Sequence, residues 1–399
     1  MKLIIFTASS GWAGLSRIVS DISCRLPETV HQTIVLLEGG MRYPYRGRLR
    51  TLGENSRKHL PVRGLRMLLN AVKFRSILKQ EDPDAVLVFH HDARAINFLA
   101  QVSLHASRCR TIAVILDVPT QYKRYFPGSR GRLHNLLISH ILRHAHRIIA
   151  TAEAVKSDIV SGYGVAPGKT DVIYAGVDSQ KVAKMAEEAV DHPWFFENVP
   201  IIVSSGRFVF QKNLADLLAA FALVREKRPC RLVLIGDGEK REALKQTAAN
   251  LGVADSVLFL GYQQNPFKFI ARSRVFAFTS LFDAQPLAIM ETMAAGCPIV
   301  AYDCPGGTRE MLALGPRKSS DGIEEAEYGL LVPVGNVDLL SNAIMRLLED
   351  QSLRARYSQL GRERARHFGI PEMAEEYFNV ITAAVSSIRE RSTHRTLVW

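Results

Sequence analysis

Short and almost continuously apolar runs recur along the chain, separated by longer stretches in which apolar residues have helical spacing. Strands that are buried on both faces of a parallel sheet have this unbroken apolar character, and helices supply the crossovers between them. The first run, residues 2–6, leads through a loop of small residues into a helix with Leu15, Ile18, Val19 and Ile22 on one face. The later runs of the first half are HQTIVLL, DAVLVFH, RTIAVIL, RIIATA and DVIYAG. The pattern predicts a doubly wound α/β sheet.

The same alternation restarts after residue 190, which predicts a second domain of the same class. Its candidate strands are PIIVSSG, RLVLIGDG, SVLFLG, VFAFTS and PIVAYD. We therefore predict two Rossmann-like domains, residues 1–190 and residues 191–371. Residues 372–399 are amphipathic, with apolar positions at helical spacing, and we expect this helix to pack back on the first domain. Ligands of such sheets bind at the carboxyl ends of the strands.

Composition narrows the class of protein. The 399 residues are 47% hydrophobic and 23% charged, which excludes a disordered chain. The five cysteines are scattered without a C-x-x-C pair, which favours a reducing compartment and offers no zinc ligand set. The apolar stretch at the N-terminus is too short for a secretory signal, and no run of 18 apolar residues occurs. We expect a cytoplasmic protein with no membrane span and no metal.

The net charge of +12 is concentrated in the first half of the chain. Residues 1–199 carry 27 Lys+Arg against 17 Asp+Glu, whereas residues 200–399 carry 24 against 22. The segment from Arg42 to Lys79 has eleven basic residues and one acid, Glu54. Nucleic acid, an anionic membrane surface or an anionic substrate would each explain this segment, and so would a solvated basic face.

Candidate chemistry follows the first strand of the second half. Gly206 allows a tight turn at the strand end, and Arg207 and Lys212 lie on the loop that opens into the next helix. Arginine offers a planar fork to phosphate oxygens, lysine adds a point charge, and the helix N-terminus adds its dipole. A diphosphate would suit this loop, although a solvated basic loop has the same composition. Gly236 and Gly238 end the next strand, where they either let a ligand or backbone approach closely or form a plain turn.

A third element runs from Thr279 to Pro298 and combines a strand, a loop and a short helix that ends at Gly296. Asp283 lies in the loop and Glu291 in the helix, and carboxylates are natural acceptors for sugar hydroxyls. The first N–H groups of the helix would point at a phosphate or a sugar hydroxyl. The alternative is that Asp283 caps the helix and Glu291 is a surface residue. The candidate backbone positions are Gln285, Pro286, Leu287 and Ala288.

These motifs in this order resemble the retaining glycosyltransferases of family 4, which have the GT-B fold. The resemblance covers most of the chain and is most specific from about Pro200 to Val334. The motifs that carry it are Val172 to Asp178, Gly206-Arg207 with Lys212, Gly236 with Gly238, Asp283 through Gly296, Asp303 to Glu310, and Tyr328 to Pro333.

The resemblance implies a role for each site residue. Arg207 and Lys212 would bind the donor diphosphate and stabilise the charge that develops as the glycosidic bond breaks. Glu291 would hold the ribose hydroxyls, and Asp283 would face the sugar ring. The family needs no metal or other cofactor, and retention is explained by front-face attack with the leaving phosphate accepting the proton.

Two departures from the family pattern concern the sugar pocket and the first loop. Of the two acids Asp283 and Glu291, the first is usually a glutamate in the family, and the aspartate here is one methylene shorter. Ala284-Gln285 stand where glycine and an apolar residue are commoner. In the N-terminal loop, Gly14 and Arg17 match the family, whereas Ala13 and Ser16 stand where the family often has a glycine and an acid. We still expect Gly11 to Gly14 to line the cleft. The G-x-G-x-x-G fingerprint of dinucleotide-binding proteins is absent.

On the acceptor side, His90 and His91 end one strand and Asp117 follows the next, so these are candidates together with Arg17. For each of them a core or surface polar role is an equal alternative. Arg63 to Lys73 has apolar residues at helical spacing with basic flanks. It is either a membrane-facing helix, as the resemblance to enzymes of envelope glycans implies, or a buried helix with a basic outer face.

We therefore expect a retaining glycosyltransferase that moves a hexosyl or N-acetylhexosaminyl group from a nucleoside diphosphate, UDP preferred and GDP the alternative, to a glycan or lipid-linked acceptor. Cell-envelope polysaccharide or lipopolysaccharide synthesis, with peripheral contact at the inner face of the membrane and no nucleic-acid partner, is the expected setting. The alternatives are a GT-B nucleotide-sugar epimerase and a sugar-nucleotide-binding scaffold.

Overall fold

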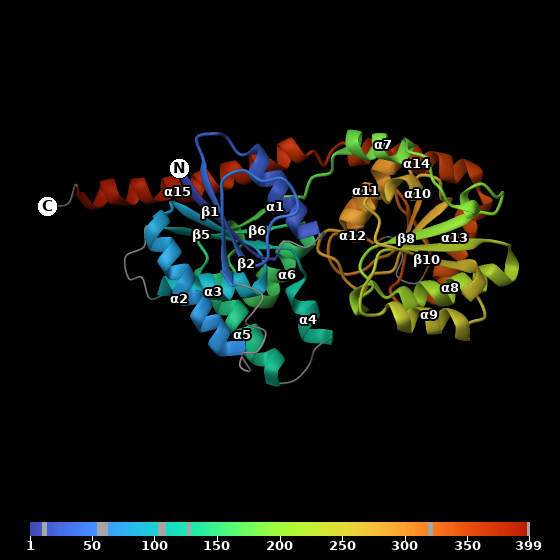
Figure 1. Cartoon of the computed structure of the whole chain (residues 1–399), viewed down its shortest axis with the longest axis horizontal. Helices are drawn as coiled ribbons and strands as arrows, with labels where there is room; N and C mark the ends of the chain where they lie inside the picture. The colour runs from blue at the N-terminus through green and yellow to red at the C-terminus, as the bar shows by residue number, and fades with distance from the viewer. Residues whose placement is uncertain (10–13, 54–62, 103–108, 126–128, 318–321, 397–399) are drawn as a thin grey trace. The chain divides into compact units, whose positions relative to one another are not determined.

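The computed structural model describes residues 1–9, 14–53, 63–102, 109–125, 129–317 and 322–396. The chain divides into two compact units, residues 1–176 with 370–399 (unit 1) and residues 177–369 (unit 2). Each unit contains one seven-stranded sheet in its described part. The predicted fold class, two Rossmann-like α/β domains, is confirmed (Figure 1).

The sheet of unit 1 is parallel and has the order β3-β2-β1-β4-β5-β6-β7. The direction of winding changes between β1 and β4, which is where such sheets bind ligands. Its strands are β1 (Lys2–Ser9), β2 (His31–Glu38), β3 (Arg48–Gly53), β4 (Ala85–Val88), β5 (Arg110–Ile115), β6 (Arg147–Ala150) and β7 (Thr170–Val172). Its helices are α1 (Gly14–Arg25), α2 (Arg63–Glu81), α3 (His91–Val102), α4 (Pro119–Tyr125), α5 (Ser129–His144), α6 (Glu153–Tyr163) and α15 (Ile370–Thr396).

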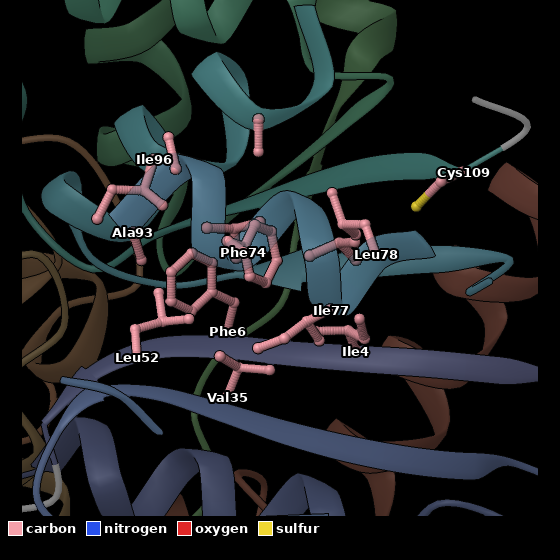
Figure 2. Close-up of a cluster of buried hydrophobic side chains, with 14 residues drawn as sticks. Ile4, Phe6, Val35, Leu52, Phe74, Ile77, Leu78, Ala93, Ile96 and Cys109 are labelled. Carbon is pink, nitrogen blue, oxygen red and sulfur yellow. The ribbon is translucent and has the colours of Figure 1, made fainter. Parts of the chain in front are cut away.

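Helices cover both faces of this sheet (Figure 1). The C-terminal α15 packs against α1, β4 and β5, and the amide of Gly176 lies 3.2 Å from the sulfur of Met373. On the other face, α2 and α3 close a core in which the rings of Phe6 and Phe74 stack with centroids 4.2 Å apart. Figure 2 shows this cluster, with Ile77 and Leu78 of α2 beside Ile4 of β1.

The sheet of unit 2 has the order β10-β9-β8-β11-β12-β14-β13, parallel except for β13. The change of winding lies between β8 and β11. Its strands are β8 (Ile201–Ser205), β9 (Arg231–Ile235), β10 (Val257–Gly261), β11 (Val275–Phe278), β12 (Ile299–Tyr302), β13 (Glu324–Glu325) and β14 (Leu330–Val332). Its helices are α7 (Ser179–Glu187), α8 (Leu214–Lys227), α9 (Arg241–Asn250), α10 (Phe267–Ile270), α11 (Leu287–Ala295), α12 (Thr308–Leu312), α13 (Val337–Glu349) and α14 (Gln351–Ala365).

The helices of unit 2 form two layers (Figure 1). One contains α8, α9 and α13, and the other contains α7, α10, α11 and α14. The predicted boundary at residue 190 would assign α7 to the first domain. Instead α7 packs on α10 and α11, so the division of the chain falls before it. The amide of Val177 also donates to the carbonyl of Phe368, 2.7 Å away.

Three strands were not predicted from the sequence: the edge strands β3 and β13, and the three-residue interior strand β14. β3 alternates basic and apolar residues, and β13 consists of two glutamates, so neither has the continuous apolar run of an interior strand. Charged edge strands of this kind protect a sheet from pairing with another chain. No helix in the described ranges combines the length and apolarity needed to cross a bilayer.

Candidate functional site

The loop after β8 presents the predicted cations at the carboxyl edge of the second sheet. It contains a single turn of 3-10 helix, Phe210–Lys212, which Asn213 ends with a left-handed φ of 46°. The side chain of Asn213 donates to Asp216, which also accepts from the buried hydroxyl of Tyr302. This turn therefore has a fixed geometry at the start of α8. Sequence reasoning missed these supporting residues because they lie on three different elements.

Lys212 is held from several sides. Its Nζ lies 2.5 Å from Oδ2 of Asp283, and its backbone carbonyl accepts from the hydroxyl of Thr279 at 2.9 Å. The side chains of Lys212 and Asp283 are 20% and 14% exposed, so the pair is partly buried and weakly screened by water. The ring of Phe278 lies 5.1 Å from the ammonium group. The structure thus brings together two of the predicted site residues, 71 positions apart in the sequence.

Arg207 differs from Lys212 in being exposed. Its guanidinium makes no hydrogen bond or ion pair with any residue that the structure describes. Gly206, Arg207 and Lys212 line one small pocket with Phe278, Thr279 and Ser280. The hydroxyl of Ser280 is buried there and has no hydrogen-bond partner in the described part of the chain. The pocket therefore combines two cations and an unsatisfied hydroxyl.

Gly236 and Gly238 serve this loop through backbone contact. Gly236 has φ 132°, and a Cβ there would overlap the carbonyl of Gly206. A Cβ on Gly238 would lie 2.5 Å from the carbonyl oxygen of Phe208. Hydrogen bonds from Gly206 to Ile235 (2.9 Å) and from Phe208 to Asp237 (2.8 Å) join the two loops. The loop after β8 therefore packs closely against these two glycines.

Asp283 is fixed by its own backbone. Its N–H donates to the carbonyl of Pro305, and its carbonyl accepts from the N–H of Gly307. Both donor–acceptor distances are 3.0 Å. The loop of Pro305 to Gly307 continues from Asp303, whose carboxylate is 2.7 Å from Nη2 of Arg309. Nη2 of Arg309 also lies 2.7 Å from Oε2 of Glu324, so this arginine bridges Asp303 and Glu324. Both carboxylates are more than nine-tenths buried. A buried ion network therefore supports the loop after β12, to which the backbone of Asp283 is hydrogen-bonded.

The segment after Asp283 forms the predicted short helix. Pro286 is the N-cap of α11 rather than a residue of its first turn, and no side chain caps the helix. The first N–H groups, at Leu287 and Ala288, therefore have no intrahelical carbonyl to bind. Gln285 is buried, and its amide nitrogen lies 3.2 Å from the sulfur of Met290. Glu291 is partly buried in the second turn of α11, and Gly296 ends the helix with φ 77°.

A second cluster of charged side chains lies at the carboxyl edge of the sheet of unit 1. His91, the first residue of α3, contacts the carboxylate of Asp117 through Nε2. Nη2 of Arg94 lies 2.8 Å from Nδ1 of the same ring and 4.0 Å from Oδ1 of Asp117. Burial alone would raise the pKa of the Asp117 carboxyl, but the contacts with His91 and Arg94 lower this pKa to about 2.

The other acceptor-side candidates are placed differently. The partner of Asp117 is His91, whereas a ring nitrogen of His90 accepts from the amide of Asp92 at 3.3 Å. Arg17 lies 3.9 Å from Asp21, one turn along α1. Gly14 is the exposed first residue of α1, and Gly11 to Ala13 lie outside the described residues. Arg94 was missed because nothing in its local sequence distinguishes it from a surface arginine.

Two further observations bound the chemistry. Among the described residues, no group of three or more His, Cys, Asp or Glu side chains could hold a metal ion. A cavity of about 620 Å³ opens in unit 1 beside Lys2, His31 and Arg48, at the amino ends of the strands. That end is opposite to the edge at which doubly wound sheets bind ligands, so its size does not make it the site.

The sequence and the fold are both similar to those of known proteins. Residues 187–364 match Glycosyl transferases group 1, and residues 12–181 match Glycosyltransferase Family 4. The N-acetylgalactosamine-N,N'-diacetylbacillosaminyl-diphospho-undecaprenol 4-alpha-N-acetylgalactosaminyltransferase of Campylobacter jejuni is 26% identical over 94% of this chain and 98% of its own.

Two solved structures share the fold over nearly the whole length of both chains. HepE from Anabaena in complex with UDP-glucose has a TM-score of 0.73 at 18% identity, covering 97% of this chain and 100% of its own. Sucrose-phosphate synthase from Thermosynechococcus elongatus has a TM-score of 0.79 at 16% identity, covering 97% and 99%.

Proposed function

The chain belongs to the group 1 glycosyltransferases of family 4, a retaining family, and from this premise we propose which donor and acceptor it uses. Unit 2 binds a nucleoside-diphosphate sugar, and unit 1 binds a lipid-linked glycan that accepts the sugar. The observation that carries the proposal is the pocket of Gly206, Arg207 and Lys212, with Asp283 paired to the lysine. It lies where the winding of the sheet changes direction.

The two cations have separable tasks in this proposal. The exposed Arg207 offers its fork to the diphosphate as the donor enters, because two parallel N–H groups match two phosphate oxygens. Lys212 is preorganised at the edge of the pocket and stabilises the negative charge that grows on the leaving diphosphate. The C1–O bond of the donor breaks, the acceptor oxygen bonds to C1 on the same face, and the departing phosphate takes the acceptor's proton.

The carboxylates orient the donor. Asp283 accepts hydrogen bonds from hydroxyls of the transferred sugar, and its backbone is immobilised by Pro305 and Gly307. Glu291 binds the ribose hydroxyls from α11. The N–H groups at the start of α11, at Leu287 and Ala288, supply further donors to the sugar or phosphate.

UDP is the proposed nucleotide, and HepE, whose fold this chain shares, was solved with UDP-glucose. A lipid-linked acceptor is supported by the diphospho-undecaprenol in the name of the Campylobacter relative. Of the five cysteines, only Cys24 is exposed and none forms a disulfide, which suits the reducing cytoplasm. We propose that the enzyme acts in cell-envelope glycan synthesis on the cytoplasmic side of the membrane.

A donor screen tests this function. Purified full chain is incubated with UDP-, GDP- and ADP-sugars, with and without an undecaprenyl-diphosphate-linked disaccharide, and release of nucleoside diphosphate is followed. We expect acceptor-dependent release from a UDP-sugar and a product with the anomeric configuration of the donor. Interconversion of the sugar nucleotide without acceptor would identify an epimerase instead. Tight donor binding without turnover would identify a scaffold.

A further inference from the structure

Asn213, which follows Lys212 and precedes α8, has a backbone conformation that few residues other than glycine adopt. Its φ and ψ are both 46°, in the left-handed region. Only two other non-glycine residues in the described part of the chain, Asp82 and His90, have a positive φ. Asparagine tolerates this region better than most residues that carry a Cβ, but the surroundings must still hold it there.

The side chain of Asn213 does not cap the helix that it precedes. An asparagine at this position ordinarily accepts a hydrogen bond from a backbone N–H of the first helical turn. Within the described ranges no side-chain cap forms on α8, and Nδ2 of Asn213 instead donates to Oδ2 of Asp216 at 2.7 Å. The asparagine side chain therefore stabilises the turn before the helix rather than the first N–H groups of the helix.

Asp216 is in turn held by a residue from another strand. Tyr302, the last residue of β12, is fully buried, and its hydroxyl donates to the same Oδ2 of Asp216 at 2.9 Å. Burial and the neighbouring carboxylate raise the pKa of Tyr302, so the hydroxyl keeps the proton that it donates. We call Asn213, Asp216 and Tyr302 the Asp216 clamp.

The Asp216 clamp fixes the peptide unit that contains the Lys212 carbonyl. The φ of Asn213 sets the orientation of that peptide unit relative to α8. In the observed conformation the Lys212 carbonyl accepts from Thr279 at 2.9 Å, and the Lys212 ammonium group lies 2.5 Å from Asp283. An ordinary helical φ of roughly −60° at Asn213 would turn Lys212 by about 100° and break both contacts.

From these contacts we infer that the Asp216 clamp positions Lys212 for the transfer step, so that Asn213, Asp216 and Tyr302 are positioning residues of the enzyme. The inference rests on the proposed function, in which the lysine stabilises the leaving diphosphate. Arg207 precedes the 3-10 turn and is exposed. Loss of the clamp should therefore reduce turnover through Lys212 and leave donor binding by Arg207 largely unchanged.

Steady-state kinetics of Tyr302→Phe tests the inference with a minimal change. The variant lacks only the hydroxyl that holds Asp216, and we expect kcat to fall about tenfold while KM for the donor stays within about twofold. Tyr357→Phe is the matched control, because the hydroxyl of Tyr357 is also buried in unit 2 but has no hydrogen-bond partner among the described residues. This control should have the kcat of the wild type.

Two substitutions of Asn213 separate its backbone conformation from its side-chain bond. Asn213→Gly loses the bond to Asp216 but adopts a positive φ without strain, whereas Asn213→Ala loses the bond and also disfavours this φ. We expect kcat to fall about threefold in Asn213→Gly and about a hundredfold in Asn213→Ala. A loss of kcat that is matched in each variant by a smaller folded fraction in urea unfolding would overturn the positioning role.

Chemical labelling of Lys212 gives a second readout that needs no turnover. The full chain is exposed briefly to an acetylating reagent, and the acetylation of each lysine is quantified by mass spectrometry of its peptides. We expect Lys212 to react about fivefold faster in Asn213→Ala than in the wild type, because its partly exposed ion pair with Asp283 is lost. Lys245, whose side chain is 45% exposed in the same unit, is the internal reference and should react equally in both.

The two readouts distinguish failure of the clamp from failure of the proposed function. Faster labelling of Lys212 in Asn213→Ala, with no turnover of any UDP-, GDP- or ADP-sugar by the wild type, would support the clamp and contradict the transferase. Wild-type kcat and wild-type labelling in both Tyr302→Phe and Asn213→Ala would overturn the clamp and leave the transferase standing. A higher KM for the donor at unchanged kcat would also overturn the clamp, because Lys212 would then act in binding.

Discussion

The ammonium group of Lys212 lies 2.5 Å from Oδ2 of Asp283 at the edge of the pocket that also contains Arg207. The lysine charge is therefore already oriented before any donor arrives, and the carboxylate that orients it is the residue that departs from the family pattern. An aspartate is one methylene shorter than the usual glutamate. We expect this difference to set how deeply a sugar ring can enter beside Lys212.

Asp283→Glu tests that expectation. The longer carboxylate should reach further into the sugar pocket, so it should alter the ratio of kcat/KM between UDP-sugars that differ in their hydroxyl or N-acetyl groups. We expect a change of about tenfold or more, since one well-placed hydrogen bond contributes roughly 1–2 kcal/mol. The measurement is kcat/KM for a donor panel. An unchanged order and ratio of donors would remove Asp283 from the determinants of sugar choice.

Gly236→Ala should disable the phosphate loop without touching a charged residue. The new Cβ would overlap the carbonyl of Gly206, so the loop that carries Arg207 must shift. We expect kcat/KM to fall by about a hundredfold, because small displacements of positioning groups have effects of this order. Gly315→Ala is the matched control, since nothing lies within 4 Å of the added carbon. Equal activity of the two variants would contradict the assigned role.

Features that depend on neighbouring residues could be predicted from the sequence, whereas contacts between residues far apart in the chain could not. The interior strands other than β14, and the helix ending at Gly296, follow from local apolar pattern and turn residues, and the structure has them. The pair of Lys212 with Asp283 could be anticipated only through the family resemblance, because the two residues approach across 71 positions. The ion pairs of Arg94 and Arg309 could not be predicted from the sequence, although Arg309 lies within the family motif Asp303 to Glu310. A buried ion network depends on which loops meet, and arginine on a helix is ordinary in sequence.

Arg309→Met should destabilise unit 2. The substitution leaves the buried carboxylates of Asp303 and Glu324 without their shared partner, and the loss of one member of a buried ion network costs about 3–5 kcal/mol. Arg317→Met removes a more exposed partner of Asp303, with a side chain 45% exposed, and should cost much less. Urea unfolding followed by tryptophan fluorescence compares the two. If Arg317→Met is the more damaging, the network has been assigned wrongly.

Asp117→Asn should weaken unit 1 in a pH-dependent way. The folded-state pKa of about 2 lies below the ordinary value of about 3.9, so the ionised carboxylate stabilises the fold above pH 4. This contribution, about 2–3 kcal/mol, is lost as the pH falls toward 2. The difference in unfolding free energy between wild type and Asp117→Asn should therefore be largest at pH 6 and shrink at pH 3. A difference that grows at low pH would have the wrong sign.

The central claim is that Arg207 and Lys212 stabilise the leaving diphosphate, and single-turnover rates with a saturating UDP-sugar test it most directly. Arg207→Ala and Lys212→Ala should each reduce the rate of sugar transfer about 10²–10³-fold, equivalent to roughly 3–4 kcal/mol of transition-state stabilisation. Lys245→Ala, which removes an exposed lysine of the same unit, should leave the rate unchanged. Wild-type rates in both Arg207→Ala and Lys212→Ala would show that the donor site lies elsewhere.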